Sequence, residues 1–342
     1  MSVNPLDQPW PAAELEDVKS CPFCQKHPRT LAYQGVQGWA LHCAPGSWTY
    51  WDCNTCQSLY LSPRPTPESI AHAYKQYYTH ADAQSASRFQ RLKTRLRNEC
   101  FSQRLQANIE PRLHLPHALQ GVIRKIGQRV ILPFGGLELA SSPRGRFLDV
   151  GCGAGQVVKL AQQLGWQAMG LEMDPLAVKM ARKNGLEILQ GRTELLLDFE
   201  DTFDCIMCSH VLEHVHQPQE LLVQLKNALK PGGMLLMILP NSLSALRQYF
   251  GAHWRGLEAP RHLAIPSEPA LVSLLEELGF SVKSLADARC ETAAESYRIQ
   301  RRSLVLNKAD SQKARRLDIN PLATPHGNDF IKLVCRLSAS ST

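Results

Sequence analysis

The sequence predicts an α/β fold in which helices cover a parallel sheet, preceded by a small cysteine-rich module and a helical region. Three observations lead to this prediction. From Arg146 onward, apolar runs of strand length alternate with amphipathic runs of helix length. Two Cys-x-x-Cys pairs lie near the N-terminus, and apolar residues at helical spacing follow them. With 342 residues, 44% of them hydrophobic, the chain can form two domains with sizeable cores.

Changes in composition divide the chain into four regions. Residues 1–20 are polar and rich in proline, and they predict a flexible tail. Residues 21–65 hold the cysteine pairs. Residues 66–140 predict a helical linker or substrate cap, with a helix over 89–109 whose apolar residues form one stripe among arginines. Residues 141–342 predict the α/β domain.

Seven strands and four helices are expected in the α/β domain. The predicted strands are Arg146–Val150, Ala168–Glu172, a short one near Ile188, Phe203–Cys208, Met234–Leu239, Phe280–Leu285 and Phe330–Leu337. The predicted helices are Gly155–Leu164, Pro175–Lys183, Pro218–Leu229 and Ser267–Leu278. Pro231-Gly232-Gly233 predicts a turn before the fifth strand.

Composition and charge favour a soluble, cytoplasmic protein. The N-terminus lacks the apolar core of a signal peptide, and no run approaches the ~18 apolar residues of a membrane span. The net charge of +7 is uneven, because residues 88–129 contain ten Lys or Arg and two Glu. A second basic stretch covers Arg298–Arg316. Such stretches can bind nucleic acid, although most are solvated faces.

A glycine-rich loop follows the first predicted strand of the α/β domain. Gly151-Cys152-Gly153-Ala154-Gly155 lets the backbone turn tightly and approach a ligand, with the next helix N-terminus directed at it. Glu172 closes the next strand, where a carboxylate can accept both hydroxyls of a ribose. The pattern predicts a nucleotide-like ligand, and by itself it also fits a dinucleotide-binding fold.

Several motifs together resemble one enzyme family. Leu148–Gln156 resembles motif I of the class I S-adenosylmethionine-dependent methyltransferases, and Gly170–Asp174 resembles their second motif. Phe203–Val215 is similar to the fourth motif, and Leu229–Leu235 to the turn that this family uses after a helix. The resemblance covers roughly 146–337 in the right order. It implies a Rossmann-like, seven-stranded sheet, S-adenosyl-L-methionine as cofactor and methyl transfer as the reaction.

The resemblance also implies which residues contact the cofactor. Those expected are Asp149, Gly151, Gly153, Glu172, Met173, Thr193, Glu194 and Ser209. Among them, Glu172 holds the ribose and Met173 lies beside the adenine. Relatives often place an acid near the adenine amino group after the third strand. Here that stretch reads Gly-Arg-Thr-Glu, so Thr193 or Glu194 takes this place.

The cysteine pairs have the spacing of a metal site. Cys21-Pro22-Phe23-Cys24 and Cys53-Asn54-Thr55-Cys56 each offer two thiolates from a tight turn. Two such knuckles make a closed tetrahedral site, which predicts a structural zinc ribbon that folds when the metal binds. A redox role for the pairs is the alternative. His27, His42 and Cys43 lie between the pairs, but the four cysteines suffice.

His210, Glu213 and His214 follow the fourth strand and are the candidates for catalysis. Their spacing puts all three on one side of a helical turn, at the strand ends where ligands bind. A hydroxyl acceptor would need a general base there. The stretch resembles quinone-pathway O-methyltransferases, which carry an acid where His210 stands and bind a divalent cation with the trio. The alternative is that Glu213 and His214 only fix the loop geometry.

An insertion over 241–265 is expected to form a lid over the acceptor site. It resembles a branch of small-molecule methyltransferases with a Trp-Arg-Gly-Leu…Pro-Arg-His-Leu lid. Arg255, Arg261 and His262 could hold an anionic acceptor such as a phosphate or carboxylate. An ordinary charged surface loop is the alternative.

The predicted function is methyl transfer to a small-molecule acceptor: a sugar, a lipid-linked compound or a secondary metabolite. Bacterial proteins with such a ribbon and a linker like Leu61–Glu68 are usually tied to surface-sugar or secondary-metabolite modification. The alternative is an RNA methyltransferase that uses the ribbon and the basic helices to bind RNA. The methylated atom and the oligomeric state stay open.

Overall fold

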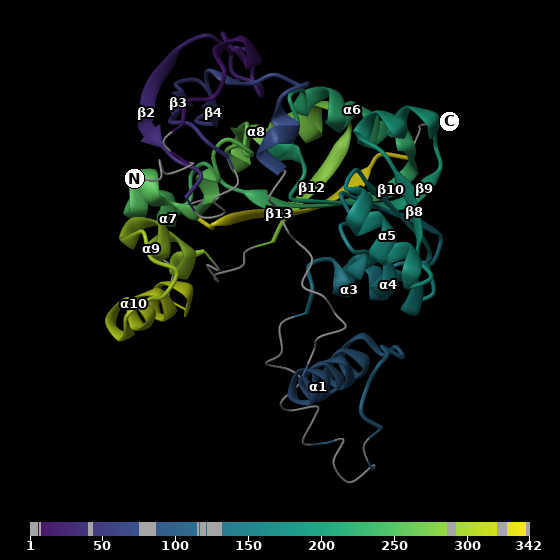
Figure 1. Cartoon of the computed structure of the whole chain (residues 1–342). Helices are drawn as coiled ribbons and strands as arrows, with labels where there is room; N and C mark the ends of the chain where they lie inside the picture. The colour runs from purple at the N-terminus through teal and green to yellow at the C-terminus, as the bar shows by residue number, and fades with distance from the viewer. Residues whose placement is uncertain are drawn as a thin grey trace. The chain divides into compact units, whose positions relative to one another are not determined.

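The computed structural model in Figure 1 describes residues 6, 8–39, 44–74, 87–114, 116, 121, 132–285, 292–319 and 327–339. The chain divides into two compact units. The first comprises Met1–Tyr77, His210–Lys226 and Met237–Ser338, and the second comprises Tyr78–Ser209, Asn227–Leu236 and Ala339–Thr342. The cysteine-rich region therefore belongs to the same unit as the 241–265 insertion.

The main sheet has seven strands in the order β12-β13-β10-β9-β6-β7-β8. The strands are β6 (Arg146–Val150), β7 (Gln167–Glu172), β8 (Glu187–Gln190), β9 (Phe203–Ser209), β10 (Leu229–Pro240), β12 (Phe280–Ser284) and β13 (Phe330–Leu337). β6 is parallel to β7 and β9, and β7 is parallel to β8, whereas β12 and β13 are antiparallel. The seven predicted strands and the mixed α/β class are confirmed.

In the second unit, β6 lies between β7 and β9. The chain proceeds from β6 to β7 and β8 on one side, and then returns to β9 on the other. Such a reversal of strand order opens a crevice at the carboxyl ends of parallel strands, where ligands bind in open α/β sheets. Four of the five residues of β6 are buried, as expected for a parallel strand covered on both faces.

α4 (Gln156–Gln163) and α5 (Pro175–Lys183) begin and end near the predicted residues and pack against the parallel strands, and Asp174 caps α5. α3 (Gly136–Ser141) precedes β6, at the end of the range expected to be helical. α1 (Arg88–Leu105) is capped by Ser87. Its expected apolar stripe is only partly buried, because Phe89 is 76% exposed. Part of the basic 88–129 stretch lies outside the described residues. Within the described chain, no helix combines the length and apolar character that a bilayer span requires.

The prediction of a turn at Pro231-Gly232-Gly233, before the fifth strand, is wrong. β10 runs from Leu229 to Pro240 and includes these residues. Gly232 has a φ of 76°, and it and Pro231 are exposed, so the glycine bend lies within an irregular, solvated start of the strand. The buried part of β10 covers most of the predicted Met234–Leu239 strand.

In the first unit, the cysteine-rich region forms an antiparallel sheet with the order β11-β4-β3-β2. The strands are β2 (Arg29–Val36), β3 (Trp48–Cys53), β4 (Leu59–Leu61) and β11 (Ala264–Ile265). β11 comes from the 241–265 insertion and pairs with β4 through Ala264 opposite Tyr60 and Ile265 opposite Leu59. Helices α6 (Pro218–Ala228), α7 (Ala245–Phe250), α8 (Glu268–Glu277), α9 (Ala293–Arg301) and α10 (Lys308–Ile319) follow along the chain.

One hydrophobic core serves the cysteine-rich region, the insertion and the C-terminal helices. It includes Tyr50 and Leu61 from the first, Trp254 and Leu263 from the second, and Tyr297 from α9. The expectation of a flexible tail over 1–20 is corrected where the structure describes that stretch. Trp10 is buried edge-on against Trp48, and β1 (Leu15–Glu16) pairs with β5 (Arg64–Pro65). The burial of the indole outweighs the proline-rich composition.

Candidate functional site

The glycine loop of the second unit is fastened to the acid that ends β7. Gly151, Gly153 and Gly155 have φ values of 70°, 52° and 78°, in the left-handed region that glycine tolerates. Glu172 Oε2 accepts a hydrogen bond from the Gly153 amide at 2.8 Å, and Oε1 accepts one from the Asp174 amide at 2.8 Å. Two backbone donors thus orient the carboxylate at the carboxyl ends of β6 and β7.

Asp149 lies in β6, two residues before Gly151, and only 3% of its surface is exposed. Burial, with a smaller contribution from the Glu172 charge, raises the pKa of Asp149 to about 8. A carboxyl in such a place favours a cationic ligand group nearby, because a positive charge would offset the cost of ionising the acid. Strongly shifted acids at strand ends are typical of functional sites.

The other predicted cofactor residues belong to the same unit. Met173 follows β7 and is 48% exposed, so a large apolar side chain stands in solvent at the strand end. Thr193 and Glu194 begin a short helix, Thr193–Asp198, after β8. The loop before it is held to β7 because the Gly191 amide donates to the Glu172 carbonyl oxygen at 2.9 Å. Ser209 is the last residue of β9.

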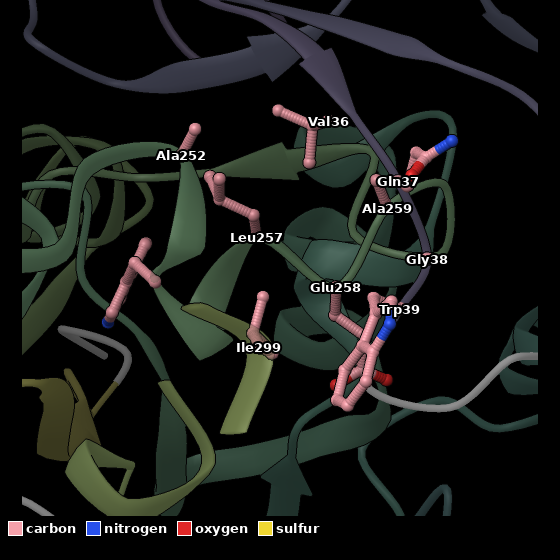
Figure 2. Close-up of a pocket in the computed structure, with 10 residues that line it drawn as sticks. Val36, Gln37, Gly38, Trp39, Ala252, Leu257, Glu258, Ala259 and Ile299 are labelled. Atoms are coloured by element: carbon pink, nitrogen blue, oxygen red, sulfur yellow. The ribbon is translucent and has the colours of Figure 1, made fainter. Parts of the chain in front are cut away.

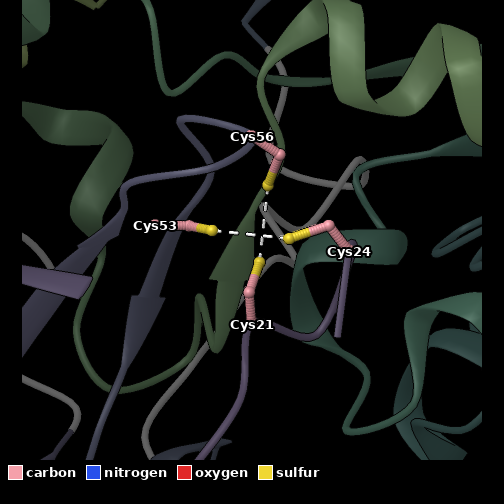
Figure 3. Close-up of side chains that lie close together, drawn as sticks. All are labelled: Cys21, Cys24, Cys53 and Cys56. Carbon is pink, nitrogen blue, oxygen red and sulfur yellow. Dashed lines mark hydrogen bonds between the residues drawn. The ribbon is translucent and has the colours of Figure 1, made fainter. Parts of the chain in front are cut away.

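The four cysteines of the first unit converge, as Figure 3 shows. Sγ of Cys21 lies 3.6 Å from Sγ of Cys56, and Sγ of Cys24 lies 3.4 Å from Sγ of Cys53. All four sulfur atoms lie within 4.8 Å of one another. Tetrahedral zinc with bonds of about 2.3 Å would separate its sulfur ligands by about 3.8 Å, so the arrangement could hold this ion. His42 and Cys43 lie outside the described residues.

His210 and Glu213 form a pair in the first unit. Nδ1 of His210 lies 3.2 Å from Oε1 of Glu213. The Glu213 side chain is fully buried, whereas that of His210 is 42% exposed. His210 has a φ of 54°, a conformation that costs energy in a residue with a Cβ atom. A buried carboxylate therefore orients an exposed imidazole.

A second group of candidate metal ligands consists of Glu213, His214 and His262. One ligand atom from each lies within 4.8 Å of the other two. His210 is not part of this group, so the trio expected from the quinone-pathway enzymes is not gathered as such. His262 takes the place of His210 in this group. Local spacing in the sequence does not reveal this, because His262 lies 48 residues beyond His214.

Both histidines of this group are buried and oriented by backbone carbonyls. Nδ1 of His214 lies 3.0 Å from the Arg261 oxygen, and Nδ1 of His262 lies 2.6 Å from the Gly256 oxygen. Burial lowers the pKa of His214 to about 4 and that of His262 well below its usual value. Each ring is therefore neutral and donates from Nδ1, which leaves the lone pair on Nε2. Backbone carbonyls hold the metal-binding histidines of known proteins in the same way.

Glu258 is a site residue that the sequence analysis missed. Its carboxylate forms ion pairs with Arg255 and Arg261. Arg261 is only 1% exposed, and its guanidinium lies 5.3 Å from the centre of the Tyr74 ring. The alternative of an ordinary surface loop is therefore wrong for Arg261. An anionic acceptor would compete with Glu258 for these arginines, and its binding there stays a prediction.

Glu258 also borders a small cavity, shown in Figure 2. The cavity is lined by Val36, Gln37, Gly38, Trp39, Ala252, Trp254, Leu257, Glu258, Ala259 and Ile299. Its volume is about 20 Å³, enough for about one water molecule. The cavity is too small to hold a substrate.

The comparisons with known proteins concern mainly the α/β region. Residues 117–285, just under half of the chain, match the family model described as a methyltransferase domain. A mitochondrial ubiquinone biosynthesis O-methyltransferase of Schizosaccharomyces pombe is 33% identical over 100 residues, which are 27% of this chain and 36% of that protein. The corresponding enzyme of Xanthomonas oryzae pv. oryzae is 34% identical over 116 residues, 32% of this chain and 47% of that protein.

The chain thus spans less than half the length of these two relatives. Among solved structures, a SAM-dependent methyltransferase from Archaeoglobus fulgidus is 21% identical, with a TM-score of 0.42, and the match covers 56% of this chain and 86% of that one. Residues 117–285 are therefore similar to a methyltransferase domain, and the two relatives that the chain matches in part are O-methyltransferases by name.

Proposed function

We propose that the protein transfers the methyl group of S-adenosylmethionine to a small-molecule acceptor. The observation that carries the proposal is the arrangement of Asp149, the glycine loop and Glu172. The buried acid favours the cationic methionine part of the donor, and the oriented Glu172 carboxylate favours its ribose hydroxyls. The names of the two relatives, both O-methyltransferases of ubiquinone biosynthesis, support a small-molecule acceptor.

For a hydroxyl acceptor, we assign the general base to His210. The residue follows Ser209, the last residue of β9, in the chain. Glu213 holds the Nδ1 proton of His210, so Nε2 is free to accept the proton of the acceptor hydroxyl. As the carbon–oxygen bond forms, the carbon–sulfur bond of the donor breaks and its electron pair stays on sulfur. The sulfonium supplies the methyl group, and Glu213 stabilises the imidazolium that His210 becomes.

We further propose two metal sites with different roles. Cys21, Cys24, Cys53 and Cys56 hold a structural zinc ion, because four thiolates leave no open position. Glu213, His214 and His262 would hold the cation that the quinone-pathway resemblance implies. Two imidazoles and a carboxylate suit zinc, iron or cobalt better than magnesium, which prefers oxygen ligands. A cation there would polarise an acceptor oxygen.

The RNA alternative gains no support from the family match or from the names of the relatives. The proposed function is tested by incubating the protein with S-adenosylmethionine labelled in the methyl group, together with small-molecule and RNA extracts of the source organism. Label in the small-molecule fraction is the expected result. Label in RNA alone would contradict the choice of acceptor, and label in neither fraction would contradict the proposed activity.

A further inference from the structure

The second cysteine knuckle contacts both ends of the 241–265 insertion. Near its start, Oγ of Ser242 donates to the carbonyl oxygen of Gln57 at 2.6 Å. Just after its end, Oγ of Ser267 donates to the carbonyl oxygen of Cys56 at 2.6 Å. Two adjacent carbonyls of one knuckle thus close a loop of more than twenty residues. Such closure removes much of the conformational freedom of the loop.

The same module also holds the middle of the insertion. The Tyr50 hydroxyl lies 2.6 Å from the Leu257 carbonyl oxygen and 2.9 Å from that of His262. The Leu61 amide donates to the Leu263 carbonyl oxygen at 2.9 Å, next to the pairing of β4 with β11. Tyr50 is fully buried, so each of these bonds is shielded from water.

The insertion connects in turn to the catalytic candidates. The Leu263 amide donates to the Glu213 carbonyl oxygen at 2.8 Å. The Arg261 carbonyl oxygen accepts a hydrogen bond from Nδ1 of His214. The position of the knuckle therefore affects where Arg261 and His262 lie. The knuckle is a tight turn, in which Gln57 has a φ of 59° and its amide donates to the Cys53 carbonyl oxygen. Cysteine knuckles of this kind depend on their metal for folding.

We propose that the second knuckle is a metal-dependent staple: metal binding by the four cysteines closes the 241–265 insertion and so positions Arg261 and His262. The module then acts as a scaffold for the catalytic side of the protein rather than as a separate binding domain. The inference does not require the proposed methyl transfer, because it concerns the ordering of one segment by another. By linkage, the insertion must stabilise the bound metal as much as the metal stabilises the insertion.

Hydrogen exchange of the full chain, together with its metal content, tests the proposal. Removing the metal with a thiol-reactive mercurial should raise amide exchange over 241–265 by about tenfold or more, the effect of losing one to two hydrogen bonds. Exchange over residues 146–172, in the other unit, should stay unchanged. Unchanged exchange over 241–265, or an equal rise in both regions, would overturn the proposal.

Variants that keep all four cysteines provide an independent arm. The double variant Ser242→Ala, Ser267→Ala should retain its zinc but release it faster to a chelator, and it should show the same rise in exchange. Ser273→Ala is the control, because this exposed serine on α8 donates to Glu277 of the same helix and, among the described residues, has no bond to the knuckle. Release at the parent rate from the double variant would contradict the staple.

Tyr50→Phe tests the middle of the insertion in the same way. It removes only the hydroxyl that bonds to the Leu257 and His262 carbonyls, so exchange should rise near these residues while the zinc content stays at the parent value. Tyr60→Phe is the control, since Tyr60 is equally buried on the neighbouring strand and, among the described residues, its hydroxyl has no hydrogen-bond partner. Equal exchange in the two variants would contradict a role of Tyr50 in holding the insertion.

Discussion

The carboxylate of Glu172 accepts a hydrogen bond from the backbone amide of Gly153 at 2.8 Å, so the acid that ends β7 fastens the glycine loop that follows β6. Together with the bond from the Asp174 amide, it orients the acid for a ribose, and it ties the left-handed Gly153 to the end of β7. Replacing Glu172 should therefore affect donor binding more than the loss of one charge on the surface would.

Glu172→Ala should weaken binding of S-adenosylmethionine by about 10- to 100-fold, because hydrogen bonds to charged groups contribute roughly 1.5–3 kcal/mol each. Calorimetric titration of the variant measures the loss. Glu187→Ala, at an exposed acid that begins β8, is the control and should bind as the parent does. Equal affinities of the two variants would contradict the assignment of Glu172.

Donor binding should release a proton at pH 7. Burial raises the pKa of Asp149 to about 8, so the free protein holds most of this proton at pH 7, and a cationic ligand favours the ionised acid. The binding enthalpy should then vary with the ionisation enthalpy of the buffer. Asp149→Asn should bind more weakly and remove the variation. A parent enthalpy independent of buffer would contradict the prediction.

The same shift affects stability without ligand. Because the folded-state pKa of Asp149 lies above the usual value near 3.9, the folded state binds the proton more tightly than the unfolded chain does. The free energy of unfolding should fall as the pH rises from about 4 to about 8. Asp149→Asn should make urea unfolding less dependent on pH in that range. An unaltered pH dependence in the variant would show that Asp149 is not the titrating group.

Gly155→Ala should destabilise the second unit more than an ordinary glycine substitution does. Both Gly155 and Gly185 have φ near 78°, so an alanine is strained at either position, by roughly 1–2 kcal/mol. At Gly155 the new Cβ would also collide with Cδ1 of Leu186, whereas nothing lies within 4 Å at Gly185. Urea unfolding should show a further loss of about 1–3 kcal/mol for Gly155→Ala over Gly185→Ala. Equal losses would mean that the packing of the loop is looser than described.

Cobalt binding should distinguish the two metal sites. The parent chain should bind two equivalents, of which only the one held by the four cysteines shows thiolate charge-transfer absorption. His262→Ala should bind one equivalent of cobalt, the one that shows the thiolate absorption, and should lose the second. His253→Ala, at an exposed histidine outside the group, should keep both. A parent that binds cobalt only with the thiolate signature would contradict the site at Glu213, His214 and His262.

The sequence predicts local features of this protein better than contacts between distant segments. The strands around Asp149 and Glu172 follow from apolar runs, and the spacing of the two Cys-x-x-Cys pairs indicates one shared site, where their sulfur atoms meet. The pairing of β11 with β4 was not predicted, since two residues of strand carry no periodic signal. Glu258 and the approach of His262 to His214 were missed for a related reason: they depend on how the insertion folds back, which its spacing does not encode.

The central claim is that the loop around Gly153 and the acid Glu172 bind S-adenosylmethionine. The most direct measurement is the equilibrium binding of S-adenosylmethionine and of NAD to the parent chain, compared by calorimetry under the same conditions, since the glycine pattern alone fits either ligand. The predicted result is saturable binding of one S-adenosylmethionine per chain and no binding of NAD. Binding of NAD without binding of S-adenosylmethionine would contradict the claim.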